Sequence, residues 1–106
     1  MRHQVARYKL NRTKSARIAL RRNLIKQFFT HERIRTTEAK AAAIRGEAEK
    51  MITIARKVKD ASDSEKVAAR RQVVSQLGNN SNEVIKKLFD EIAPRFADRN
   101  GGYTRV

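Results

Sequence analysis

The chain lacks cysteine and tryptophan and has a single proline, Pro94, in 106 residues. Without cysteine it can form neither a disulfide framework nor a thiolate metal site. Aromatic residues make up only 6% of the chain, and 14 of its hydrophobic residues are alanine, so the core it can bury is thin. No apolar run approaches the ~20 residues of a membrane span, and no signal-peptide core follows Met1. These absences favour a small cytosolic domain with no membrane partner.

The chain has little acidic charge to balance its basic charge. Twenty-five Lys and Arg against 11 Asp and Glu give a formal net charge of +14. Residues 1–35 carry 11 of the basic residues and only one acid, Glu32, whereas residues 36–106 carry 14 basic and 10 acidic residues. Such an excess repels itself unless a polyanion neutralises it. The distribution predicts a basic arm over residues 1–14, followed by a single globular domain over residues 15–106.

Hydrophobic periodicity and capping residues predict about four helices. Ser15 can cap a first helix that runs through residues 16–29. Thr36 or Thr37 can cap a second that extends to about Val58, with an apolar face of small residues. The S-x-x-E pattern at residues 62–65 is a capping box for a third, which Gly78 ends. Ser81 can begin a fourth, whose regular part is limited by Pro94.

Two short segments have the pattern of β-strands. Residues 32–37 (ERIRTT) alternate and are rich in β-branched side chains, and residues 102–106 begin at the second of two glycines, which permit a sharp turn. Each segment is the other's only evident partner. The order of elements is therefore arm, helix, strand, three helices and strand, which is typical of an α+β fold.

The sequence offers no catalytic or metal-binding constellation, and no cofactor motif. Its two histidines, His3 and His31, have no other ligand residue at helical spacing. The pair Gly101 and Gly102 lacks the preceding strand and following helix of a phosphate-binding loop. The acids pair at helical spacing with basic residues, as a solvated surface does. The sequence therefore predicts a non-enzymatic protein.

The basic residues fall into three groups that favour nucleic acid. The arm interleaves cations with aromatic rings on which unpaired bases can stack. The first helix carries cations in a stretch of 31 residues without an acid, and others surround the terminal glycines. The predicted contacts are Arg2, His3, Arg7, Tyr8, Lys9, Arg12, Lys14, Arg17, Arg21, Arg22, Lys26, Arg95, Arg99 and Arg105. Arg70 and Arg71 are equally consistent with an ordinary exposed surface, and Phe96 and Tyr103 are expected to pack.

RNA is favoured over DNA, although composition alone leaves both open. No helix pair has the short turn of a helix-turn-helix, and nothing resembles a zinc finger or a basic zipper. A charged extension on a small body suits the crevices of a folded RNA. The alternatives are a nucleoid-type DNA-binding protein, a protein-interaction adaptor and, more remotely, an RNA-modifying enzyme.

Several short sequence motifs, taken in their order along the chain, resemble those of a known family. They are MRH at the start, LNR at residues 10–12, RRN at 21–23, HERIRTT at 31–37, KLFDEIAPRF at 87–96 and RNGGYTRV at 99–106. Together they resemble the L-seventeen family of bacterial large-subunit ribosomal proteins. The resemblance covers essentially the whole chain and is most specific at its two ends.

The resemblance implies a two-layer α+β fold, with helices packed on a small mixed sheet. It also implies a structural role in the large ribosomal subunit, bound to large-subunit (23S-type) ribosomal RNA and supporting its folding and assembly. Neighbouring ribosomal proteins, including L-thirty-two, are implied partners. It adds Asn11, Thr36, Thr37 and Lys40 to the predicted RNA contacts.

The chain departs from the family pattern in three places. The arm reads Gln4, Val5 and Ala6 where members are usually basic and include a glycine. Ala16 stands where members tend to have histidine, so a contact by that imidazole is absent. Members usually continue past GGYTR into a further strand, whereas this sequence stops at Val106. The final strand of the usual sheet is therefore expected to be missing, leaving an exposed edge.

Overall fold

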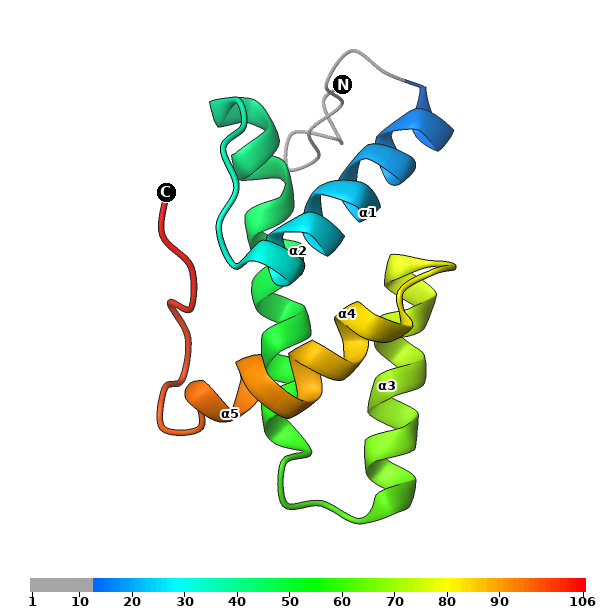
Figure 1. Ribbon diagram of the computed structural model, residues 1–106, viewed down its shortest axis with the longest axis vertical. Helices are drawn as coiled ribbons and strands as arrows, with labels where there is room; N and C mark the ends of the chain where they lie inside the picture. Colours follow the sequence, from blue (N-terminus) through cyan, green and yellow to red (C-terminus); the bar gives the residue numbers. More distant parts are fainter. Residues whose placement is uncertain (1–12) are drawn as a thin grey trace, which may run out of the picture.

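The structure, a computed structural model, describes residues 13–106, which form helices joined by irregular segments (Figure 1). Its elements are α1 (Lys14–His31), α2 (Glu38–Lys57), α3 (Asp63–Leu77), α4 (Asn82–Lys87), the π-helical turn η1 (Leu88–Ile92) and α5 (Ala93–Arg95). None of the helices in residues 13–106 is long and apolar enough to cross a membrane.

The expected mixed sheet is wrong, because residues 13–106 contain no β-strand. Neither residues 32–37 nor residues 102–106 form a strand, and no backbone hydrogen bond joins the two segments in this part of the chain. Glu32 ends α1 in the left-handed conformation, with φ 62°, and Thr37 already serves as the N-cap of α2. The backbone of Tyr103 and Thr104 instead bonds to side chains of α2. Two short strands without a third are marginal alone, which favours this arrangement.

The helix ends agree with the capping signals, with one shift. Thr13, and not Ser15, caps α1, its Oγ1 accepting from the amide of Ala16 at 3.3 Å. Thr37 caps α2. Ser62 caps α3, and its hydroxyl also donates to the Glu65 carboxylate at 3.1 Å. These local bonds satisfy amides that have no partner inside the helix.

The fourth predicted helix is divided by a π-helical turn just before Pro94. Residues 82–87 are α-helical, and the amide of Ala93 then bonds to the carbonyl of Leu88, five residues earlier. Proline provides no amide for the next bond of the ladder, and its ring crowds the preceding turn. The wider turn lets the chain continue through Pro94 into α5.

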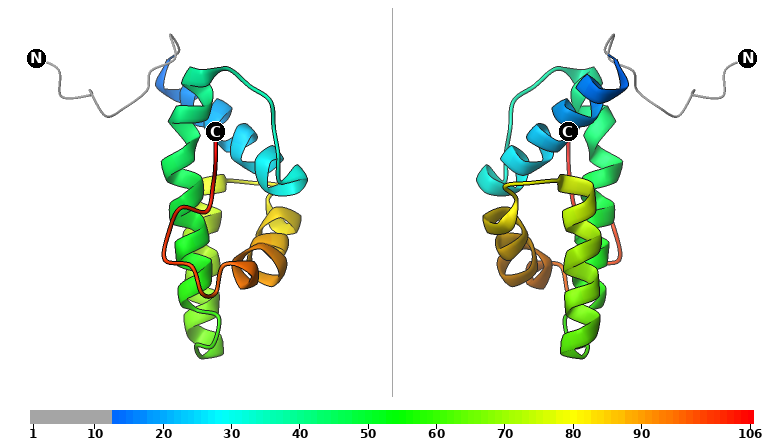
Figure 2. Two further views of the ribbon diagram at one scale, coloured as in Figure 1. Left: turned by 90° about the vertical axis from the view of Figure 1, so that its left-hand side faces the viewer. Right: turned by 90° about the vertical axis from the view of Figure 1, so that its right-hand side faces the viewer.

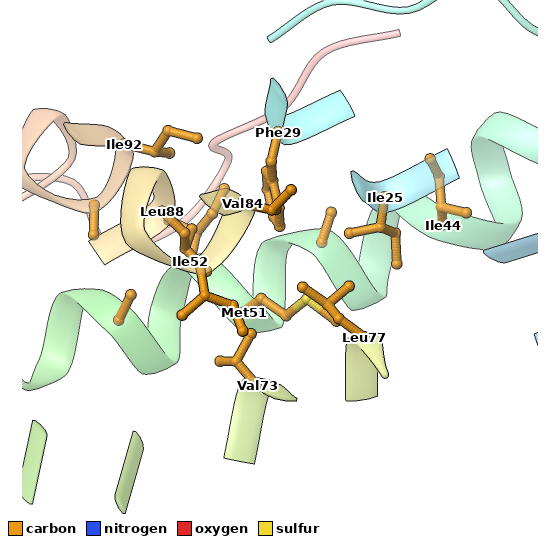
Figure 3. Packing of buried hydrophobic residues seen from close by; sticks show 14 residues of the cluster. Ile25, Phe29, Ile44, Met51, Ile52, Val73, Leu77, Val84, Leu88 and Ile92 are labelled. Carbon is orange, nitrogen blue, oxygen red and sulfur yellow. The ribbon is translucent and has the colours of Figure 1, made fainter. Parts of the chain in front are cut away.

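The core lies where α2 is covered by the other helices. Met51, Val73, Leu77 and Leu88 have at most 1% of their surface exposed. Figure 3 shows these side chains meeting residues of α1, α4 and η1 over one face of α2. The apolar faces of α2 and of the run from α4 to α5 therefore supply most of the core.

The helices leave the two irregular segments on one side of α2. The link between α1 and α2 and the C-terminal residues 101–106 both run near the N-terminal half of α2 (Figure 1, Figure 2). α3 returns antiparallel to α2, and the run from α4 to α5 crosses in front of it. The side of α2 on which the two irregular segments lie carries a groove between them.

Candidate nucleic-acid interface

Seven of the predicted RNA contacts lie outside the described residues: Arg2, His3, Arg7, Tyr8, Lys9, Asn11 and Arg12. The others lie on α1, near the N-terminus of α2, on α5 and in the residues that follow α5.

Three cations of α1 are engaged by the protein itself. Arg21 Nη1 lies 2.7 Å from a carboxylate oxygen of Glu47 on α2. Arg22 and Lys26 reach the end of α3 instead, where helix carbonyls lack partners in their own helix. These side chains therefore join α1 to α2 and α3.

The bonds of Arg22 and Lys26 complete the C-terminus of α3. Arg22 donates from Nε to the carbonyl of Gln76 at 3.0 Å and from Nη2 to that of Ser75 at 3.3 Å. Lys26 Nζ donates to the carbonyl of Asn79 at 2.7 Å. Cations at a helix C-terminus are also favoured by the helix dipole. Glycine is favoured at residue 78 because its φ is 79°; a Cβ there would lie 3.0 Å from Arg22 Nη1, so that the flexible guanidinium would have to shift slightly.

Lys14 and Arg17 face outward at the start of α1. Lys14 is exposed and Arg17 half-buried, and neither has an ion pair with another of residues 13–106. Their positive charge remains available to a partner of opposite charge.

Arg95 joins α5 to the end of α1. Both of its terminal nitrogens hydrogen-bond the Glu32 carboxylate, and Lys87 Nζ lies 3.2 Å from the same group. The bonds from Arg95, followed by that from Lys87, lower the pKa of Glu32 from 4.5 to about 2. Lys87 also donates to the carbonyl of Thr30 at 2.6 Å. The cluster ties the segment after α1 to the α4–α5 run, although half of the Arg95 side chain remains exposed.

The C-terminal segment is held by Glu49 and Arg45 of α2. Glu49 accepts from the Thr104 hydroxyl at 2.6 Å and from the Tyr103 amide at 3.3 Å. The bond from Thr104 is the main reason that the pKa of Glu49 is lowered, with Arg45 contributing. Phe96 and Tyr103 pack edge to face at 5.2 Å, as expected for these aromatic residues.

The remaining predicted contacts lie around the N-terminal end of α2 and the chain's end. Thr37 caps α2, its Oγ1 accepting from the amide of Lys40 at 3.3 Å. Thr36 and Lys40 are half-buried, whereas Arg99 and Arg105 are exposed. The α3 residue Arg70, left open by the sequence, lies over the Phe89 ring and 3.4 Å from Asp90.

A groove of about 830 Å³ separates the two segments that were expected to pair. Residues 33–36 line one side and residues 104–106 the other, with Phe28 and Ile44 also lining it. Arg33 and Arg35 line this groove together with Arg105. The sequence reasoning did not select Arg33 or Arg35. Their alternation with Ile34 is the signal by which they could have been found.

Comparisons with known proteins agree on one family. The family model for ribosomal protein L17 matches residues 20–106. A protein of Fervidobacterium nodosum named large ribosomal subunit protein bL17 is 47% identical over 109 residues, covering all of this chain and 84% of the relative. The equivalent proteins of Symbiobacterium thermophilum and Geotalea daltonii are 50% and 48% identical.

The relatives differ in length. The chain covers 83% of the Symbiobacterium protein, but it spans only about half (54%) of the Geotalea protein. The similarity nevertheless extends over 96% of this chain in the first case and all of it in the second. The chain belongs to the ribosomal protein L17 family.

Proposed function

We propose that this chain is a structural, non-catalytic constituent of the large ribosomal subunit. It binds large-subunit ribosomal RNA and supports the folding and assembly of that RNA on the cytoplasmic ribosome. The observation that carries the proposal is the family match over residues 20–106, together with relatives named for the large subunit. Because some relatives are much longer, the proposal concerns the part of the protein represented by these 106 residues.

The charge of the described residues supports an RNA partner. Lys14 and Arg17 of α1, and Arg99 and Arg105 near the C-terminus, form no ion pair with another of residues 13–106. Phosphate neutralisation relieves such like-charge repulsion and releases counterions from the RNA. Lys14, Arg17, Lys40, Arg99 and Arg105 are the predicted basic contacts whose side chains form neither an ion pair nor a hydrogen bond within residues 13–106.

We propose that the basic arm over residues 1–14 also contacts the RNA and that the body over residues 15–106 provides the remaining contacts. Arg21, Arg22, Lys26 and Arg95 contribute through long side chains that also stabilise the body. Proteins beside this one on the subunit, with L-thirty-two among them, are proposed as further partners on the strength of the family resemblance.

Within residues 13–106, the main apolar stripes do not favour the nucleoid alternative. The apolar stripes of α2 and of the α4–α5 run are buried in the protein's own core, so neither is available as the dimer face that such a protein needs. The similarity to ribosomal proteins then decides between the two.

Rebinding to stripped ribosomal particles tests the proposal. Large and small subunits are washed with high salt to remove loosely held proteins and then mixed with the labelled chain at moderate salt. We expect saturable, stoichiometric co-sedimentation with large-subunit particles and little with small-subunit particles. Equal, non-saturating binding to both would refute a specific role in the large subunit.

A further inference from the structure

Asn100 is the one asparagine in the sequence that a glycine follows, since Gly101 comes next. The other asparagines, at positions 11, 23, 79, 80 and 82, precede Arg, Leu, Asn, Ser and Glu. Asparagine is thermally labile in proteins, because the backbone nitrogen of the following residue can attack its side-chain amide. A glycine has no Cβ to obstruct that attack and restricts the backbone least. The sequence around Asn100 therefore favours the attack more than that around any other asparagine of the chain.

The fold leaves the reacting groups of this pair accessible. Asn100 is exposed and lies in the irregular run that follows α5. The Gly101 amide, which provides the attacking nitrogen, donates no hydrogen bond within residues 13–106. A Cβ built at residue 101 would meet nothing within 4 Å, so the space around the pair is open. The nitrogen can therefore approach the Asn100 side chain without first breaking a hydrogen bond.

Arg56 of α2 holds the side-chain amide of Asn100. Its Nη2 donates to Oδ1 of Asn100 at 2.6 Å, and its Nε donates to the carbonyl of Phe96 at 2.9 Å. These two bonds fix the planar guanidinium relative to the turn. A cation at Oδ1 draws electron density from the amide carbon Cγ, and it stabilises the negative charge that the oxygen gains when a nucleophile adds. Arg56 is thus placed to make Cγ more reactive.

We propose that Asn100 is a site of spontaneous deamidation and that Arg56 promotes the reaction. The Gly101 amide loses its proton to solvent, and its nitrogen forms a bond to Cγ of Asn100. The bond from Cγ to Nδ2 then breaks, and Nδ2 takes a proton from solvent and leaves as ammonia. A cyclic succinimide remains, which one water molecule opens. Cleavage of the bond between the nitrogen and Cγ gives aspartate, whereas cleavage of the bond between the nitrogen and the main-chain carbonyl carbon gives isoaspartate.

Both products change the surface next to α5. Each places a carboxylate where a neutral amide stood, which lowers the net charge of +14 by one. Aspartate keeps the contact with Arg56 and makes it an ion pair. Isoaspartate adds a carbon to the backbone just before Tyr103, whose amide bonds to Glu49, and so disturbs the attachment of this segment to α2. The proposal does not depend on the proposed function, since its only co-reactant is water.

Ageing of the purified full chain tests the proposal. The chain is incubated in mildly alkaline buffer, with and without urea, and digested with a glutamate-specific protease. The peptide of residues 92–106 contains Asn100, and the peptide of residues 66–83 contains three of the other asparagines. Mass spectrometry follows the gain in mass as OH replaces NH2, and chromatography separates the aspartyl from the isoaspartyl peptide.

We expect the 92–106 peptide to deamidate roughly 10-fold faster than the 66–83 peptide, and to give both products. Gly101→Ala is compared in urea, where the strain of φ 149° at that residue is absent, and should react roughly 10-fold more slowly than the parent chain. Equal rates for the two peptides, or for Gly101→Ala and the parent chain in urea, would overturn the site.

Arg56→Gln tests the contribution of the guanidinium. It should slow deamidation of the folded chain about 2- to 10-fold, the effect of one hydrogen bond to a developing charge, and should match the parent chain in urea. Lys50→Gln removes the same charge from an exposed residue of α2 and is the matched control. Equal rates for the two folded variants would overturn the role of Arg56. Each of these outcomes leaves the proposed function standing.

Discussion

Replacing Glu49 by glutamine is predicted to release the C-terminal segment from α2 without unfolding the helices. The Glu49 carboxylate accepts three bonds, from the Thr104 hydroxyl at 2.6 Å, the Tyr103 amide at 3.3 Å and Arg45 Nε at 3.3 Å. Its side chain is 22% exposed, so each bond is weaker than in a dry interior. Glutamine keeps the shape but loses the charge and one acceptor oxygen. We expect the free energy of local opening of the C-terminal segment to fall by about 1–2 kcal/mol.

Hydrogen exchange measures this local loss directly. A cost of 1–2 kcal/mol corresponds to exchange of the Tyr103 amide that is about 5- to 30-fold faster. Amides of buried α2 residues should change little, because the segment opens separately from the core. Glu83→Gln, at the start of α4, is the matched control and should leave the Tyr103 amide unchanged. Unaltered exchange at Tyr103 in Glu49→Gln would refute the reasoning that this carboxylate holds the segment.

Three further changes probe the body. Leu88→Ala, at a residue with 0% exposure, should lower the free energy of unfolding by ~2–5 kcal/mol in urea titrations; a cost below ~1 kcal/mol would contradict its central place in the core. The bonds from Arg95 lower the pKa of Glu32 to about 2, so Glu32 stabilises the fold fully above its unfolded pKa of 4.5, and this contribution is lost as pH falls toward 2. Glu32→Gln should therefore flatten the loss of stability between pH 4.5 and 2, and an unchanged pH profile would contradict this. Arg22→Gln should lower the free energy of unfolding by about 1 kcal/mol because the hydrogen bonds to the α3 carbonyls weaken. Lys86→Gln should not change it measurably, and equal effects of the two substitutions would show that the capping bonds are not stabilising.

The helices could be predicted from the sequence because their signals are local. Thr37, Ser62 and Gly78 each act within a few residues of a helix end, and the structure confirms all three as caps. The apolar stripe of α2 was equally readable, since its spacing alone defines a buried face. The shift of the first cap to Thr13 falls within the usual uncertainty of a helix boundary.

The prediction of a sheet was wrong because strand pairing depends on segments that are distant in the sequence. The alternation in residues 32–37 could not show whether another segment lies within hydrogen-bonding distance. Residues 104–106 instead lie across a groove. Sequence reasoning predicted RNA contacts for Arg22 and Lys26, but it could not show that backbone carbonyls more than 50 residues away also accept hydrogen bonds from these side chains. It passed over Arg33 and Arg35, since it treated their segment only as a strand.

The most direct test of the RNA-binding function is a competition titration. Labelled large-subunit ribosomal RNA is bound by the full chain at moderate salt and challenged with duplex DNA of equal phosphate content. The proposed function predicts that the RNA complex survives a large excess of DNA, because the protein recognises the folded shape of the RNA. Displacement of RNA by DNA in proportion to phosphate would contradict it, since the protein would then be responding to charge alone.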